Sequence, residues 1–169
     1  MKSIMLLVVT AIIFVSMVAS VPWPNTTYTL SVNSPTSFCM FMPPHKGDSV
    51  GGTISKGVPQ CTSSKLSNSH RVFPKGFIVS AHYAINNTEH FEQITGKIDP
   101  SKYGLSTSDQ GGQYDYQQIS GVLCNYDHFF VALLEPAHNR FCIRCCKYSR
   151  DCVTDESSKG CPAVIPGAY

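Results

Sequence analysis

Clusters of basic residues are absent from this sequence, and charge of either sign is sparse. Lysine and arginine number 13 and aspartate and glutamate number 11, so charged residues make up only 14% of the chain. Nucleic-acid affinity comes largely from lysine and arginine meeting phosphates, and the scattered basic residues here form no such patch. We therefore expect no nucleic-acid partner.

The sequence also lacks a long stretch with an apolar period of 3.6 residues, and it contains no internal repeat. Helical bundles and solenoids are therefore excluded. Short apolar runs alternate with turn-rich segments, a pattern typical of strands joined by turns. The predicted fold class is all-β, namely a small disulfide-stapled β-sandwich or barrel with long loops.

No apolar run is followed by the basic cluster that a transmembrane anchor needs. Lys2 precedes an apolar run over residues 4–18, and small residues stand at positions −3 and −1 of a cut after Ser20. This arrangement predicts a secretory signal peptide at residues 1–20. The C-terminal segment has neither an apolar tail nor a retention signal, so we expect no membrane anchor and a secreted, extracellular protein, with cell-wall association as one destination.

The chain after residue 20 is long enough for one ordinary domain with a real core. Residues 21–36 form a polar segment rich in proline, threonine and serine, and residues 37–169 are predicted to be a single disulfide-stapled, β-rich domain. Oligomeric state is not readable from these features.

All eight cysteines follow the predicted signal peptide, and an even number in an exported chain is typical of disulfides. They are Cys39, Cys61, Cys124, Cys142, Cys145, Cys146, Cys152 and Cys161. Zinc and redox chemistry are the alternatives. A zinc site lacks a second cysteine pair with ligand spacing, and a redox pair would open a helix rather than end a strand-like run. We predict structural disulfides, no metal and no cofactor.

Eight cysteines allow 105 pairings, so the connectivity stays open. Cys39 and Cys61 stand apart from the others and flank one loop, and this is the pair that we favour. Cys145 and Cys146 are adjacent, and we expect them to bond to two different segments.

The clearest predicted hairpin spans residues 77–98. The sequence has two N-glycosylation motifs, at Asn25 and Asn86, and the second lies on this hairpin. Alternation over residues 77–85 predicts a half-buried strand with apolar side chains on one face. The residues of that face are Phe77, Val79, Ala81, Tyr83 and Ile85. Residues 86–89 are predicted to form the turn, with Asn86 at the tip, and residues 91–98 the return strand.

Further elements are shorter. Residues 38–42 are predicted to form a strand, and Asp99-Pro100 reads as the cap of a helical turn. Residues 43–71 and 106–118 are predicted to be mostly polar loop.

Two fragments have the composition of serine-hydrolase motifs. Residues 47–51 fit Gly-x-Ser-x-Gly, and residues 80–83 resemble the histidine segment of trypsin-like proteases. The first has no helix-forming run after it, and the order of the two fragments is the reverse of that in those proteases. None of the six histidines has a recognisable partner residue that would make it a general base, so no catalytic residue is predicted.

The segment 109–115 is the candidate binding site, with Asp109, Gln113, Tyr114 and Asp115 as its residues. Its carboxylates and amides are oxygen ligands suited to Ca²⁺, but the spacing does not match an EF-hand. A tight glycine turn with Asx bonds is the favoured interpretation. A sugar-stacking platform is the alternative for the tyrosines of this region, which are Tyr103, Tyr114, Tyr116 and Tyr126.

Several stretches, in collinear order, carry a resemblance to a known family. They are residues 37–44, 76–83, 95–105, 109–115, 134–136, 139–146 and 160–169. The chain resembles the small fungal secreted proteins known as macrophage-activating glycoprotein-like. The resemblance implies a fungal, exported, glycosylated protein and assigns no catalytic residues.

The functional expectation is a non-enzymatic extracellular protein of the fungal surface or secretome that binds a cell-wall glycan or a host protein. Two alternatives stay open at this point. One is a small secreted hydrolase that uses an acid pair such as Asp109 and Asp115. The other is an effector or inhibitor that contacts a host protein through residues 43–71.

Overall fold

The computed structural model describes residues 28–169, and within them nearly all regular structure is strand, arranged in three sheets. The predicted all-β class is therefore confirmed. In this part of the chain the sheets stay open and do not close into a barrel. The predicted signal peptide and Asn25 lie outside the described residues.

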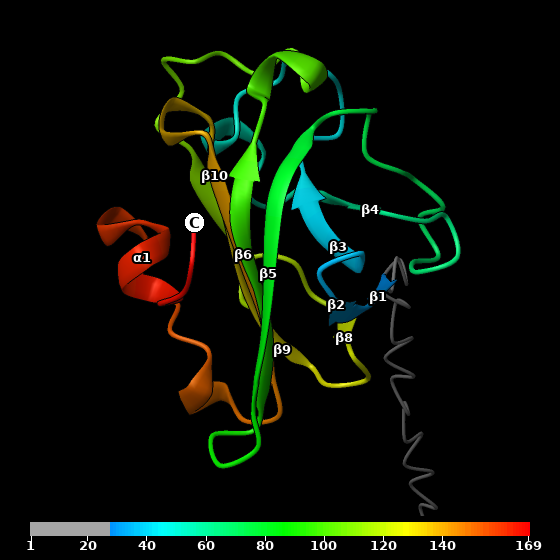
Figure 1. Ribbon diagram of the computed structural model, residues 1–169. Coiled ribbons are helices and arrows are strands. Elements are labelled where there is room, and N and C mark those ends of the chain that lie inside the picture. The colour runs from blue at the N-terminus through cyan, green and yellow to red at the C-terminus, as the bar shows by residue number, and fades with distance from the viewer. Residues whose placement is uncertain (1–27) are drawn as a thin grey trace, which may run out of the picture.

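The central element is a five-stranded antiparallel sheet in the order β5-β6-β10-β9-β7. Its strands are β5 (Ile78–Asn86), β6 (Phe91–Ile98), β7 (Gly112–Asp115), β9 (Phe129–Glu135) and β10 (Arg140–Cys146). The hairpin of β5 and β6 agrees with the predicted strand, turn and return strand, and it extends beyond the rest of the molecule (Figure 1).

Two smaller sheets complete the β-structure of residues 28–169. One has the order β2-β3-β4, and the other pairs β1 with β8 in parallel. Their strands are β1 (Thr29–Leu30), β2 (Val32–Ser34), β3 (Ser37–Met42), β4 (Val58–Cys61) and β8 (Leu123–Cys124). β1 and β2 belong to the segment 21–36, and they bury Leu30 and Val32 in the same core as β3.

Short helical turns lie between the strands and after the last strand, β10. They are η1 (Gly51–Thr53), η2 (Pro100–Tyr103), η3 (Pro136–His138), η4 (Ser149–Asp151), η5 (Ser157–Lys159) and the α-helical turn α1 (Cys161–Val164). The cap predicted before η2 is confirmed, because the Asp99 side chain accepts a hydrogen bond from the Ser101 N–H. Among residues 28–169 we find no helix of sufficient length and apolar character to cross a membrane.

The strands β9 and β10 are buried on both faces, which explains their nearly continuous apolar runs. Successive side chains of a strand point to opposite faces. Phe130, Ala132 and Leu134 of β9 pack on the inner core, which is shared with β2 and β3. Val131 and Leu133 pack on the outer core, beneath the C-terminal segment. Figure 1 shows β3 and β4 on one side of this sheet and α1 on the other.

All eight cysteines form disulfides, and the predicted pair Cys39–Cys61 is confirmed. The other three bonds are Cys124–Cys145, Cys142–Cys161 and Cys146–Cys152. The adjacent Cys145 and Cys146 bond to different segments, as predicted. They point to opposite faces of β10, so one bond enters the inner core and the other the outer core.

Two loop predictions were wrong in part. Residues 43–71 contain β4, which is buried along its whole length and pairs with β3. Residues 106–118 contain β7, which pairs with β9. Pro59 and Gln60 interrupt the apolar pattern of β4, and β7 carries glycine, glutamine and aspartate. Neither strand therefore showed the alternation on which the prediction depended.

The predicted apolar face of β5 also needs correction. Val79 is 62% exposed and Ile85 is 53% exposed, whereas Ala81 and Tyr83 pack against the core. A bulge between Ile78 and Ser80 adds one residue and turns Val79 outward. Ile85 is exposed because it lies near the end of the protruding hairpin.

We predict that Gly96→Ala strongly destabilises the fold. A Cβ at position 96 would collide with the Ser80 carbonyl oxygen of β5 and approach the Phe141 ring. The free energy of unfolding should fall by about 3 kcal/mol, as for other overpacked cores. Gly51→Ala is the matched control, because its nearest contact would be ordinary, 3.7 Å from the Gly111 oxygen. Urea unfolding of both variants measures the difference, and equal stabilities would contradict the prediction.

Candidate functional site

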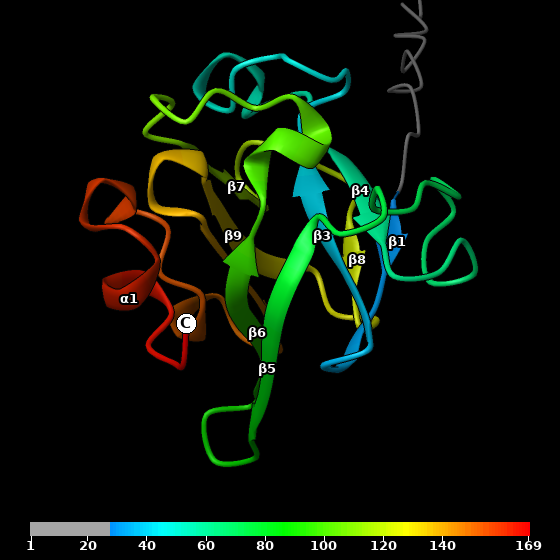
Figure 2. The same ribbon diagram turned by 45° about the horizontal axis from the view of Figure 1, so that its top comes forward.

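A polar groove of about 450 Å³ opens on the outer face of the sheet, beside the edge strand β7. Figure 2 shows β7 next to β9 at this end of the sheet. Amides, hydroxyls and carboxylates line the groove together with a few apolar side chains. The polar side chains are those of Gln110, Gln113, Asp115, Gln117, Gln118, Glu135, His138, Thr154, Ser157 and Ser158.

Gln113 is one of the buried side chains of the groove, with 7% of its surface exposed. Its Nε2 donates to Asp115 Oδ2 at 2.7 Å and to the Thr154 carbonyl oxygen at 2.7 Å. Both partners accept only, so the amide is fixed in one orientation. Its Oε1 is buried and receives no hydrogen bond from residues 28–169.

Asp115 holds the next turn of the chain in place. Its Oδ1 accepts from the N–H groups of Gln117 and Gln118, at 2.8 and 3.0 Å, while Oδ2 accepts from Gln113. Only 3% of the residue is exposed. The carboxylate therefore shapes this wall of the groove.

Asp109 and Tyr114, the other two predicted binding residues, do not line this groove. Asp109 accepts from the Gly111 N–H at 2.9 Å, which is the predicted Asx turn, and from the Val50 N–H at 2.8 Å. Tyr114 points to the inner face and is fully buried, with its ring stacked on Phe41. The structure brings only Gln113 and Asp115 together at the groove, so Asp109 and Asp115 do not flank a common cleft.

The tyrosine platform, the alternative considered for this region, does not form. Tyr103 and Tyr114 are both buried in the inner core, whereas Tyr126 is almost fully exposed. Burial in the apolar interior raises the pKa of Tyr103, and it raises the pKa of Tyr114 strongly. The Tyr114 hydroxyl lies 3.2 Å from Thr53 Oγ1, with which it shares a hydrogen bond.

The opposite wall of the groove is the loop that carries Thr154, Ser157 and Ser158. Two disulfides hold this loop to β10, one at each end: Cys146–Cys152 before it and Cys142–Cys161 after it. The wall therefore depends on covalent bonds, because the loop itself contains little regular structure.

Glu135 closes one end of the groove, and it is 6% exposed. It forms an ion pair with Arg140, its register partner across the β9-β10 hairpin, and accepts from the Cys161 N–H at 3.2 Å. Gly160 has a φ of +75°, and a Cβ there would collide with Glu135. Glu135 thus joins the hairpin to the start of α1.

Sequence reasoning missed Glu135 and the hydroxyl-bearing loop. Glu135 could have been predicted from the sequence, because Glu135 and Arg140 flank the short turn Pro136–Asn139 and pair with each other in a hairpin. The loop could not, because its position depends on the disulfide connectivity. Among residues 28–169 there is no group of three or more histidine, cysteine, aspartate or glutamate side chains arranged to hold a metal ion.

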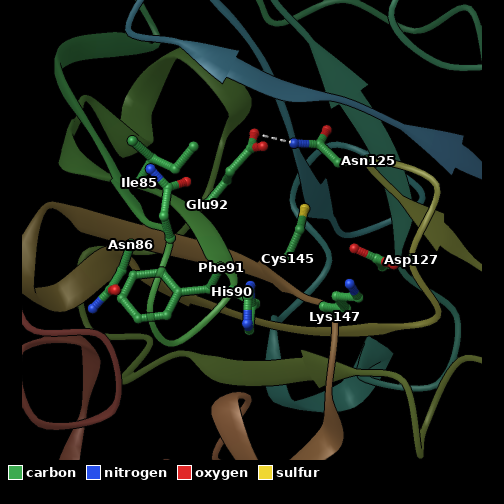
Figure 3. A pocket seen from close by; sticks show the side chains of 10 residues that line it. Ile85, Asn86, His90, Phe91, Glu92, Asn125, Asp127, Cys145 and Lys147 are labelled. Atoms are coloured by element: carbon green, nitrogen blue, oxygen red, sulfur yellow. Dashed lines mark hydrogen bonds between the residues drawn. The ribbon is translucent and has the colours of Figure 1, made fainter.

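A second, smaller hollow of about 190 Å³ lies beside the turn end of the β5-β6 hairpin. Figure 3 shows Glu92 of β6 and Asn125 pointing toward each other across it, with Cys145, Asp127 and Lys147 nearby. Asn125 Nδ2 donates to Glu92 and also to the Val32 carbonyl oxygen. Asn86, which carries the second glycosylation motif, lines the same hollow.

Comparison with known proteins identifies a similarity to a fungal protein. Over 92 residues, 53% of this chain, the sequence is 34% identical to appressorium protein ROW2 of Mycosarcoma maydis. The match covers 30% of that relative's length, so the chain spans less than a third of it. No protein-family model and no solved structure matches the chain. The fungal relative and the four disulfides are consistent with an extracellular location.

We predict that removing Cys142–Cys161 loosens the groove wall. The double change Cys142→Ala and Cys161→Ala should lower stability by about 3 kcal/mol and raise hydrogen exchange in residues 153–160. The double alanine variant of Cys39 and Cys61 is the control, because it opens a loop of similar length elsewhere. Mass-spectrometric hydrogen exchange under native conditions separates the two. Equal protection of residues 153–160 in both variants would contradict the role of the clamp.

We further predict an alkaline loss of stability that Tyr114 contributes. Its pKa is raised in the folded protein, so its contribution is fully present below pH 10, the pKa of an unfolded tyrosine, and is lost as pH rises through the folded value. Tyr114→Phe should cost about 1 kcal/mol at pH 7 through the lost Thr53 hydrogen bond. Above pH 10 the free energy of unfolding of the wild type falls by about 1.4 kcal/mol per pH unit through this residue. Urea unfolding should therefore show that the wild type and Tyr114→Phe become equally stable near pH 11. A constant difference from pH 7 to 11 would refute it.

Proposed function

We propose that this protein is a non-catalytic, secreted protein of the fungal surface or secretome that binds a cell-wall carbohydrate in the groove beside β7. Secretion rests on the signal peptide predicted for residues 1–20, and N-glycosylation at Asn86 is part of the same proposal. The cysteine content and the fungal relative support an extracellular setting.

The observation that carries the proposal is the Gln113 side chain. Its amide nitrogen is held by two acceptors, and its oxygen is buried at the groove without a donor from residues 28–169. A buried carbonyl oxygen without a partner costs about 1–3 kcal/mol. This oxygen has almost no accessible surface, so a ligand reaches it only when the adjoining loop of residues 153–158 moves aside, and a hydrogen bond donated there then offsets that cost. A sugar hydroxyl is such a donor.

The remainder of the groove has matching chemistry. Gln117, Gln118, Ser157 and Ser158 are able to donate and to accept, as the hydroxyls of a sugar do. The volume of about 450 Å³ falls within the range usual for small-ligand sites. A concave site with many neutral hydrogen-bonding groups favours a polyhydroxylated ligand over an apolar or strongly charged one.

The two carboxylates of the groove favour binding over catalysis. Asp115 accepts from two backbone N–H groups and from Gln113, and Glu135 is paired with Arg140 and the Cys161 N–H. Glycoside cleavage needs one carboxyl group free to donate a proton and a second free to act as nucleophile or base. Both groups here are engaged in holding the chain.

The proposal predicts retention of the purified mature protein on insoluble chitin or β-glucan, and binding to the matching oligosaccharides on a glycan array. Gln118→Ala and Ser158→Ala, each of which removes a polar group of the groove, should weaken the affinity about 3- to 10-fold per change. Ser64→Ala and Thr107→Ala, exposed positions outside the groove, are the matched controls. Calorimetry with the best oligosaccharide measures all four.

Two further conditions sharpen the test. Reduction of the disulfides should abolish binding, because the wall that carries Ser157 and Ser158 is then released. Absence of retention on every wall polymer in the oxidised state would refute the carbohydrate ligand. Release of shortened sugars during incubation would refute the non-catalytic assignment.

A further inference from the structure

The turn at the end of the β5-β6 hairpin fixes the side chain of the second N-glycosylation motif. The Asn86 Oδ1 atom accepts hydrogen bonds from the N–H groups of Thr88 and Glu89, at 2.9 and 3.0 Å. Its Nδ2 atom donates to Glu89 Oε2 at 3.0 Å. An asparagine amide nitrogen carries two hydrogens, so one remains beside the hydrogen that Glu89 accepts. The turn therefore sets the direction in which a glycan leaves Asn86.

Phe91 is the neighbour of Asn86 across the hairpin. The two residues stand opposite each other in the antiparallel register of β5 and β6, which places both side chains on the same face of the sheet. Figure 3 shows the Asn86 amide beside the Phe91 ring. Both residues also line the hollow of about 190 Å³, so open space adjoins the amide and the ring.

The Phe91 ring is held in place by the protein beneath it. The Arg144 guanidinium lies over the ring, 3.9 Å from its centroid. Arg144 is itself fixed, because its Nε donates to Gln93 Oε1 at 2.9 Å and its Nη1 donates to the Asp151 carbonyl oxygen at 3.1 Å. The ring is half-buried, so part of it stays open to a ligand. A fixed ring beside a fixed attachment atom lowers the entropy lost when a sugar contacts both.

We propose that the first N-acetylglucosamine of an N-linked glycan on Asn86 packs against the Phe91 ring, so that the end of the hairpin binds the protein's own carbohydrate. The inference rests on the glycosylation of Asn86 that is part of the proposed function. Attachment forms a bond between Nδ2 and C1 of the sugar, breaks the bond between C1 and the diphosphate of a lipid-linked sugar donor, and releases one amide proton.

The chemistry of the sugar and the ring is complementary. One side of a hexosamine ring presents C–H groups with small positive partial charges, and the face of a phenylalanine ring is negative. Contact between them also removes apolar surface from water. The sugar is covalently bound to the side chain opposite Phe91, so its effective concentration at the ring is high. A contact that would be weak between separate molecules is therefore populated here.

The first test is a double-mutant cycle between the glycan and the ring. Thr88→Ala abolishes the motif but keeps the backbone N–H that donates to Asn86, and Phe91→Leu removes the ring. All four proteins carry Asn25→Gln, so that Asn86 has the one remaining motif, and an endoglycosidase trims its glycan to one N-acetylglucosamine. We expect this sugar to raise the Tm by roughly 2–4 °C when Phe91 is present and to leave it unchanged in Phe91→Leu. An equal effect in both backgrounds would overturn the inference.

The second test locates the sugar directly by NMR with ¹³C-labelled N-acetylglucosamine. Protons of a sugar that lies over an aromatic ring shift upfield, so we expect such shifts with Phe91 and none in Phe91→Leu. Their absence in a protein that carries the sugar would overturn the inference and leave the glycosylation itself intact. Absence of a glycan on Asn86 in the mass spectrum of the secreted protein would overturn both. Retention on wall polymers reports on the groove beside β7 and is measured separately.

Discussion

The structure depends on covering the outer face of the five-stranded sheet. That face is apolar along β9 and β10, where Val131, Leu133, Cys142 and Cys146 point outward. A sheet with two apolar faces needs a layer on each side. The C-terminal segment provides the second layer with Val164 and Ile165, and the described part of the chain contains too little helix for a conventional cover. The disulfides compensate, because they hold irregular chain against the sheet at fixed points.

The polar side chains of the outer face follow from the same cover. Gln93 of β6 donates to the Pro166 carbonyl oxygen, and Thr95 donates to that of Ala168, so the strand satisfies the irregular backbone that lies over it. On the edge strand β7, Gln113 likewise donates to the Thr154 carbonyl oxygen. Buried irregular backbone requires such donors, because its carbonyl groups lack a ladder partner. The groove beside β7 arises where this cover stops short of the sheet edge and leaves one side of the Gln113 amide without a partner.

Much of the fold could be predicted from the sequence, and the limits have physical causes. The hairpin predicted at residues 77–98, the strand predicted at residues 38–42 and the cap at Asp99 depend on local patterns, and the structure shows them at 78–98, 37–42 and Asp99. The pair Cys39–Cys61 was predicted because those cysteines stand apart from the rest. β4 and β7 escaped prediction because long-range pairing formed them against their own propensities. In the segment 109–115 the pattern favoured a turn, and the strand within it assigned Gln113 to one face and Tyr114 to the other. Which of them reaches a groove depended on the position of residues 153–158, and the cysteine connectivity fixes that position.

The adjacent cysteines of β10 support two separate parts of the structure. Cys145 points inward to Cys124 and supports the two-residue turn of Asn125 and Tyr126. Cys146 points outward to Cys152 and supports the loop that faces Gln113. One strand therefore stiffens a turn on one side and a groove on the other, through neighbouring residues. Rigid support of this kind lowers the entropy lost when a surface binds. Because alternation along β10 separates the two bonds, a change that weakens one part is expected to leave the other intact, and the free-energy effects of the two should be additive.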